Sequence, residues 1–98
     1  MIRHLVAWKL ATADPEARAS QAQKMSTDLM ALRGAVPEII DIVVGPDVVG
    51  GGNWDVALVA DFADRAALEA YLTHPDHLAV VTYVRSVVSD RVAVDLEV

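Results

Sequence analysis

Apolar and polar residues alternate along four stretches of the chain, a pattern typical of β-strands that present two different faces. The predicted strands are Ile2–Leu10, Ile39–Gly45, Trp54–Phe62 and Arg91–Glu97. In the first strand one face carries, in order, Ile2, His4, Val6, Trp8 and Leu10. In the last strand the more apolar face carries Val92, Val94 and Leu96. We expect the more apolar face of each strand to lie beneath helices.

Between these strands, apolar residues recur at the spacing of helices. Asp14 is the predicted cap of a first helix that ends at Gly34, and Pro37 prevents its continuation. Asp64 is the predicted cap of a second helix, which runs through Leu72. Pro75 then begins a third helix that reaches about Ser86. Residues 46–53, with three consecutive glycines, are predicted to form a flexible hairpin loop.

This order of elements predicts an α+β protein, a ferredoxin-like βαββαβ protomer with a four-stranded antiparallel sheet. The first and third strands are expected at the centre of the sheet, with all helices on one face. The chain of 98 residues is predicted to form a single domain, 1–98.

The sheet face without helices is expected to have an apolar middle and charged margins. Its predicted apolar residues are Leu5, Ala7, Val43, Ala57, Val59 and Ala93. Its predicted charged residues are Arg3, Lys9, Asp41, Asp55, Asp61, Arg91 and Asp95. Such a surface is typical of a subunit interface, so we expect a homodimer in which two sheets stack into a barrel. The alternative is a half-solvated sheet with scattered apolar residues.

Composition narrows the function classes. The net charge of −6 and the pI of about 4.7 argue against partners that are nucleic acids or anionic membrane surfaces. The chain has no cysteine, which excludes disulfides, thiolate catalysis and Cys-ligated zinc. No apolar stretch reaches the length of a membrane span, and the cytoplasm is the expected location.

Candidate chemistry is concentrated in the segment 71–77, which holds two of the three histidines and one of the two tyrosines. His77 is predicted in the first turn of the third helix, where positive partial charge keeps its imidazole neutral and able to accept a proton. Tyr71 is suited to donate a hydrogen bond to an enolate oxygen. The alternative is that Tyr71 is a core aromatic residue and that His77 belongs to the helix cap.

The other candidate residues have pocket or structural roles. His4, on the helix-facing side of the first strand, either shapes a pocket or fixes the sheet to a helix through a hydrogen bond. Val6, Trp8 and Trp54 are candidate pocket walls, although the tryptophans also suit a plain core. His74 is also a candidate pocket residue, and the alternative is that it caps a helix at the junction. No metal site is predicted, because Pro75 interrupts the helix and the imidazoles need not share a face.

Several segments occur in an order that resembles a known family. They are His4–Leu10, Val36–Pro37, Trp54–Phe62, Tyr71–His77 with its His-Pro-Asp-His element, and Arg85. The chain is similar over nearly its whole length to the stress-responsive dimeric α/β-barrel (Dabb) family. This resemblance implies a ferredoxin-like protomer, a homodimer built through the sheets, and a small pocket between sheet and helices.

The resemblance also implies candidate roles. In olivetolic acid cyclase-type polyketide cyclases, aldol chemistry is attributed to a Tyr and a His that match Tyr71 and His77, and a His that matches His4 lies by the same pocket. It implies no organic cofactor. We therefore expect a cyclase-like enzyme of the lyase class that takes a small apolar or poly-keto molecule. The alternatives are a non-catalytic dimer that binds a small molecule or serves the stress response, and a cofactor-free monooxygenase of the related barrel type.

Overall fold

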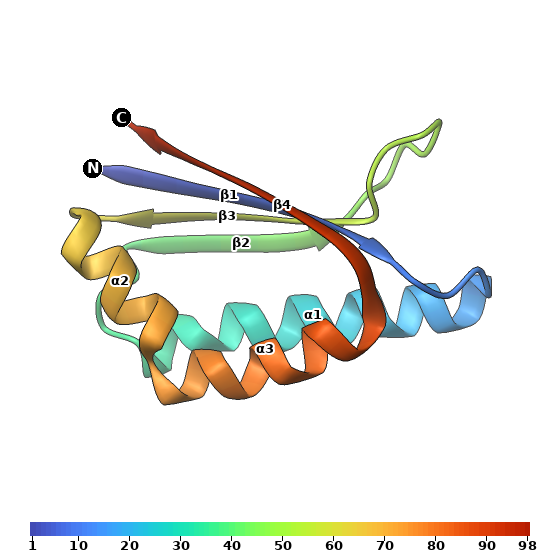
Figure 1. The fold of residues 1–98 in the computed structure, drawn as a ribbon, viewed down its shortest axis with the longest axis horizontal. Coiled ribbons are helices and arrows are strands. Elements are labelled where there is room, and N and C mark those ends of the chain that lie inside the picture. Colours follow the sequence, from blue (N-terminus) through green and yellow to red (C-terminus); the bar gives the residue numbers. More distant parts are fainter.

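The computed structural model describes all 98 residues as one sheet with three helices packed on one of its faces (Figure 1). The elements in chain order are β1 (Ile2–Leu10), α1 (Pro15–Ala35), β2 (Asp41–Pro46), β3 (Val56–Phe62), α2 (Arg65–Thr73), α3 (Pro75–Val87) and β4 (Val88–Glu97). The strand order is β2-β3-β1-β4, and every neighbouring pair is antiparallel. The predicted ferredoxin-like βαββαβ fold, with the first and third strands at its centre, is confirmed.

The helix starts follow the local sequence. The carboxylate of Asp14 accepts a hydrogen bond from the Ala17 N–H at 3.0 Å, and that of Asp64 accepts one from the Ala67 N–H at 2.8 Å. None of the three helices is long and apolar enough to cross a membrane.

The end of α1 differs from the prediction. Gly34 stays within the helix and has no positive φ, so it does not act as a left-handed stop. The helix ends at Ala35 because Val36, which precedes Pro37, is held in an extended conformation. The Val36 N–H still donates to the Leu32 carbonyl at 2.8 Å, which satisfies one of the last helical acceptors.

The hydrophobic core lies between the sheet and α1. Side chains from one face of β1, β2 and β3 pack against the buried stripe of α1, whose members are Ala22, Met25, Leu29 and Leu32. From β1 the core receives Val6, Trp8 and Leu10, as its alternation predicted. Tyr71 of α2 and Phe62 of β3 are among the largest fully buried side chains. The core therefore fixes the position of α2 against the centre of the sheet.

The predicted orientation of β4 is wrong. Antiparallel pairing sets Val94 opposite Leu5 and Val92 opposite Ala7, and residues that face each other across two strands point to the same side of the sheet. Val92, Val94 and Leu96 therefore lie on the face without helices. Their neighbours in the alternation, Arg91, Ala93 and Asp95, lie on the helix side, although the sequence pattern favoured the reverse. We call the face without helices the open face.

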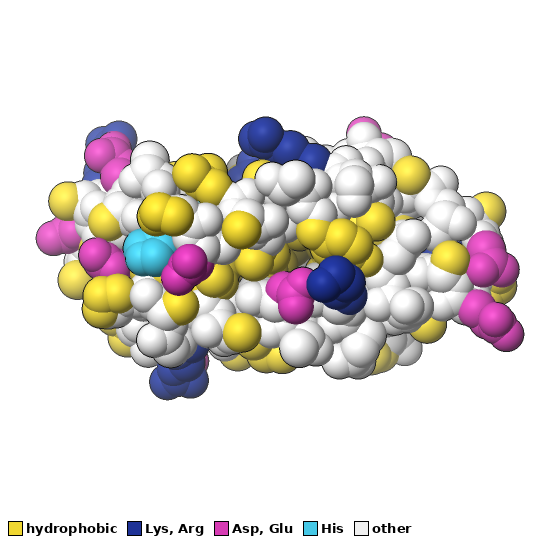
Figure 2. Space-filling model, turned by 90° about the horizontal axis from the view of Figure 1, so that it is seen from below, with side chains coloured by type: hydrophobic (Ala, Val, Ile, Leu, Met, Phe, Trp, Pro, Cys, Tyr) yellow, Lys and Arg dark blue, Asp and Glu magenta, His cyan; other side chains and the backbone are white.

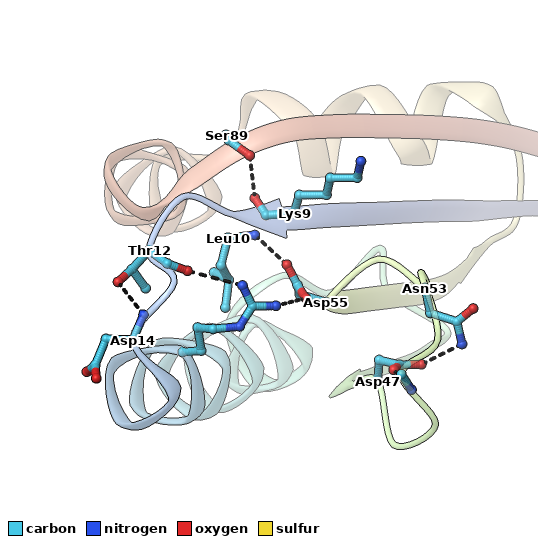
Figure 3. A network of polar contacts seen from close by, with 10 residues as sticks. Lys9, Leu10, Thr12, Asp14, Asp47, Asn53, Asp55 and Ser89 are labelled. Carbon is cyan, nitrogen blue, oxygen red and sulfur yellow. Dashed lines mark hydrogen bonds and ion pairs between the residues drawn. The ribbon is translucent and has the colours of Figure 1, made fainter.

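Two aspartates were predicted on the open face, and only one of them lies there. Asp61 lies there as predicted, in an ion pair with Arg3 in which Nε and Oδ1 are 2.9 Å apart. Asp55 instead turns towards α1, where it accepts hydrogen bonds from the Leu10 N–H at 2.8 Å and from the guanidinium of Arg18. Figure 3 shows this network, which ties the end of β1 and the segment before β3 to the first turn of α1. Asp55 thus has a structural position inside the protomer.

The connection between β2 and β3 is a loop stabilised by its own side chains. Gly50, Gly51 and Gly52 all have positive φ, which explains the glycine run. The carboxylate of Asp47 accepts hydrogen bonds from the Gly50 N–H at 2.6 Å and from the Asn53 amide at 2.9 Å (Figure 3). The loop is therefore an organised turn held by its own hydrogen bonds.

Candidate active site

A cavity of about 460 Å³ lies between the sheet and the α2–α3 pair. Ten of its 14 lining residues are hydrophobic, so it suits a molecule with a largely apolar body. The polar lining residues are His4, His77, Arg85 and Arg91, together with the hydroxyl of Tyr71. Figure 2 views the molecule from the helix side, where hydrophobic side chains lie among scattered acidic and basic ones. The cavity thus combines a mainly apolar wall with several ionisable side chains.

Five of the residues singled out from the sequence line this cavity: His4, Val6, Trp8, Tyr71 and His77. Two do not. Trp54 lies on the open side of the sheet, with the Lys9 ammonium 4.9 Å from its ring centroid. The prediction that Trp54 is a wall of this cavity is therefore wrong, because its side chain lines a separate hollow beside Ala7 and Asn53. His74 caps α3, and its Nδ1 accepts a hydrogen bond from the Asp76 N–H at 3.1 Å.

Tyr71 lies at the centre of an aromatic cluster. Its ring centroid is 4.3 Å from that of His77 and 5.0 Å from that of Phe62, and His4 approaches edge-on at 6.4 Å. Burial raises the pKa of the Tyr71 phenol to about 12. The phenol is therefore protonated at neutral pH and can donate a hydrogen bond into the cavity.

His77 is held in one tautomer by the end of α2. Its Nδ1 lies 3.1 Å from the Leu72 carbonyl oxygen, which can only accept, so Nδ1 carries the proton. In the neutral ring Nε2 then keeps a free lone pair. Burial lowers the pKa of His77, and the neighbouring His4, Arg91 and His74 lower it further, while the bond to Leu72 opposes this shift. The imidazole is therefore neutral near pH 7 and able to accept a proton.

His4 forms a second polar centre with Asp95, a residue that the sequence argument missed. Nδ1 of His4 lies 2.5 Å from Oδ1 of Asp95 across the β1–β4 pair. The side chain of His4 is 5% exposed and that of Asp95 is 44% exposed. A carboxylate at Nδ1 fixes the ring and leaves Nε2 as the nitrogen available to a ligand. Only the register of β4 on β1 could have revealed this pair, and the predicted orientation of β4 placed Asp95 on the other face.

Arg85 and Arg91 were also not proposed as site residues from the sequence. Arg85 lies in the last turn of α3, and Arg91 lies opposite Trp8 on β4. Both line the cavity, and both are solvent-exposed, so they lie at its rim. Arg85 could have been found from the sequence, because it is one of the residues that carry the family resemblance. Arg91 gave no signal because it was assigned to the open face.

A metal role for the three histidines finds no support in their arrangement. No group of three or more His, Cys, Asp or Glu side chains is placed to hold a metal ion. Nδ1 of His4 is directed to Asp95, that of His77 to the Leu72 carbonyl and that of His74 to the backbone of α3. The polar groups of the cavity are suited instead to proton transfer and to hydrogen bonding of an oxygen.

With this geometry, comparison with known proteins becomes informative. The family model for the stress responsive A/B barrel domain matches residues 2–98. The chain belongs to the stress responsive A/B barrel (Dabb) family. No curated protein matches it.

Solved structures of similar sequence or shape agree with the ferredoxin-like fold. A dimeric ferredoxin-like protein of unknown function from Thermobifida fusca is 33% identical, with a TM-score of 0.84 over 99% of this chain and 90% of that one. Another, from Bacteroides fragilis, is 28% identical, with a TM-score of 0.92 over 99% and 95%. A hydroxynitrile lyase from Passiflora edulis is 17% identical, with a TM-score of 0.80 over 97% and 90%, a likeness that shows the fold alone. Two of these three structures are described as dimeric.

Proposed function

We propose that this Dabb protein is a cyclase-like enzyme of the lyase class, in which His77 is the general base and Tyr71 binds the developing oxyanion. One observation carries the proposal. The Tyr71 and His77 rings lie 4.3 Å apart on one cavity, and the bond from His77 to Leu72 leaves its second nitrogen free to take a proton. A neutral imidazole beside a protonated phenol is a suitable pair for removing a proton next to a carbonyl.

The proposed reaction is an intramolecular aldol closure of a poly-keto substrate. Nε2 of His77 takes the proton from a carbon between two carbonyls, and the electron pair moves to form an enolate. The Tyr71 hydroxyl donates a hydrogen bond to the enolate oxygen. The enolate carbon then attacks a second carbonyl of the same molecule, and the imidazolium returns its proton to the new alkoxide. The apolar cavity, about 460 Å³ in volume, would favour the folded substrate over extended conformers.

His4, Val6 and Trp8 are proposed to bind and shape the substrate without exchanging protons with it. Val6 and Trp8 are buried residues of the cavity wall on β1. His4 is fixed by Asp95, so its remaining ring nitrogen can bind a substrate oxygen at a constant position. His74 is assigned no chemical role, because its side chain caps α3.

The proposed assembly is a homodimer through the open face. β4 turns Val92, Val94 and Leu96 to this face, where they are 43–52% exposed in the protomer. Val43 and Val59 extend the apolar surface across β2 and β3. A strand that exposes its valines on the face without helices is expected where a second sheet covers that face. The description of similar structures as dimeric supports this assembly.

The decisive experiment replaces His77 by Ala and measures turnover of an activated poly-β-keto thioester. We expect kcat/KM to fall by about 100- to 10,000-fold, the usual contribution of a general base. His74→Ala is the matched control, with near-normal activity, and circular dichroism checks the fold of both variants. Because burial lowers the pKa of His77, the acid limb of the wild-type kcat/KM profile should have its midpoint below pH 6.5, the ordinary value for histidine. Unchanged turnover by His77→Ala would end the proposal.

The mainly apolar lining of the cavity equally suits a non-catalytic binding protein. A thermal-shift screen of small apolar metabolites, followed by recovery of the ligand, separates the two functions. A ligand that stabilises the protein and is recovered unchanged favours binding alone. Oxygen uptake with hydroquinones would instead favour the cofactor-free monooxygenase.

A further inference from the structure

Two arginines at the cavity rim have no partner within the protein. Four of the other six basic residues form ion pairs, which join Arg3 to Asp61, Arg18 to Asp55, Lys24 to Asp28 and Arg33 to Asp41. The remaining two, Lys9 and Arg65, do not line the cavity. No carboxylate lies within ion-pairing distance of Arg85 or Arg91. Asp95 and Glu97 are the acidic residues on the helix side of β4: Asp95 is bonded to His4, and Glu97 lies at the far end of the strand, opposite Ile2. The rim thus presents two uncompensated positive charges.

The position of Arg91 directs its charge to the candidate catalytic residues. It stands opposite Trp8 on the helix side of β4, so its side chain leaves the sheet towards the cavity. Its side chain lines the same cavity as Tyr71 and His77. Burial is the largest influence on the pKa of each of these two groups, and the positive charge of Arg91 acts as a smaller influence that lowers both pKa values. Arg85 reaches the same cavity from the last turn of α3.

The surroundings indicate which anion would fit. The lining contains no Ser, Thr or Gly, and Arg85 stands at the C-terminal end of α3, away from the N-terminal amides of that helix. The rim beside the arginines therefore lacks the hydroxyls and helix N-terminal amides that commonly hold phosphate. A guanidinium is instead well suited to a planar carboxylate, which it can bind through two parallel hydrogen bonds. The chain as a whole carries a net charge of −6, which repels anions in general. Attraction of an anion is therefore a local property of this rim.

We infer that the cavity selects a substrate with a carboxylate group, which Arg91 and Arg85 hold at the rim while the apolar body of the molecule extends to Tyr71 and His77. The inference rests on the proposed function, because it treats the cavity as the substrate site. It narrows the substrate class from poly-keto molecules in general to keto acids. It also gives the two arginines a role in binding orientation, separate from proton transfer.

The experiment measures binding, so that it does not depend on turnover. Phenylhexanoate and phenylhexanamide are matched probes of nearly equal size, one anionic and one neutral. Isothermal titration at low, fixed ionic strength gives the ratio of their dissociation constants for each protein. We expect the wild type to bind the acid about tenfold more tightly than the amide, a preference typical of a charge-assisted hydrogen bond.

Four variants connect this preference to the rim. Arg91→Gln and Arg85→Gln should each reduce it, and the double variant should abolish it. Arg65→Gln is the matched control, because Arg65 is exposed on α2, has no ion pair and does not line the cavity. These arginines are all exposed, so their replacement should leave the fold intact. Equal binding of acid and amide by the wild type, or a preference that survives the double change, would overturn the inference.

The outcome can be separated from that of the proposed function. His77→Ala should keep the acid preference while it loses turnover. If the protein prefers the acid but cyclises no substrate, the cyclase proposal is wrong and the carboxylate inference stands. If the protein cyclises a neutral poly-keto thioester and shows no preference for acids, the carboxylate inference is wrong and the cyclase proposal stands.

Discussion

The two faces of the sheet are formed by the same strands but carry different kinds of side chains. On the helix side, β1 and β4 present His4 and Arg91 to a cavity, and Asp95 holds the ring of His4. On the open face, the intervening positions of the same strands present Leu5, Ala7, Val92 and Val94, and no helix covers them. The chemistry thus lies on the side that already has a core, and the most apolar positions of β4 lie where a second chain is expected.

This contrast teaches that apolarity alone does not mark the buried face of an edge strand. In a protomer that is to be half of a barrel, the open face becomes a core only after assembly. The helix side of β4 lies beside a cavity, so it tolerates charges that a filled core would exclude. Alternate residues of β4 therefore differ in character: those on the open face are apolar and suit a subunit interface, and those on the helix side include charged residues that suit the cavity.

The largest expected effect comes from a charge at the centre of the open face. Val59 lies between Leu5 and Val43 in the sheet register. Val59→Asp would place two unpaired carboxylates in the dimer interface, at a cost of about 3 kcal/mol or more, and should weaken the dimer at least about 100-fold. Sedimentation velocity over a range of concentrations measures this. Val49→Asp, in an exposed loop, is the control that should stay dimeric, and a Val59→Asp protein that remains a dimer at nanomolar concentration contradicts the proposed interface.

The next largest effect concerns the helix side of the sheet, where Tyr71 is buried. Its pKa is raised from 10.0 to about 12 in the folded protein, so the unfolded chain loses this proton first as the pH rises. The contribution to stability is complete below pH 10 and is lost between about pH 10 and 12, on the order of 2 kcal/mol. Urea unfolding at pH 8 and 11.5 should show a smaller alkaline loss for Tyr71→Phe than for wild type. Tyr83→Phe, which leaves Tyr71 in place, should behave like wild type, and equal losses for all three proteins would contradict the burial argument.

The smallest effect concerns the bond across β1 and β4. Asp95→Asn keeps a side chain of the same size but removes the charge beside His4, so kcat/KM should fall about tenfold as the imidazole loses its fixed orientation. The ¹⁵N chemical shifts of His4 should change as well, which a purely structural role in packing would not require. Asp90→Asn, on the same strand without contact to an imidazole, is the control. Unchanged His4 signals in Asp95→Asn would show that the carboxylate does not set the tautomer.

Much of the fold could be predicted because its signals are local. The caps at Asp14 and Asp64 and the alternation of β1 depend on residues within a few positions of one another. The same holds for Tyr71 and His77, which one short turn between α2 and α3 brings together. The Gly34 prediction was wrong because Val36 and Pro37 end α1 without any need for a left-handed residue.

Asp95, Arg91 and Trp54 could not be placed in the same way. Their surroundings come from partners far away in the chain, 91 residues in the case of Asp95 and His4. A shift by one residue would send every side chain of β4 to the other face, and the sequence of β4 alone is compatible with either choice.

The sequence by itself determined the order of the elements, the helix starts and the close spacing of the phenol and imidazole, since each depends on short-range sterics and hydrogen bonding. The tertiary structure decided which face of β4 meets the helices, and with it the His4–Asp95 pair and the two arginines at the cavity rim. The physical reason is that the face of each β4 residue follows from its pairing with β1, including the register shift between Lys9 and Leu10, and these partners lie far away in the sequence.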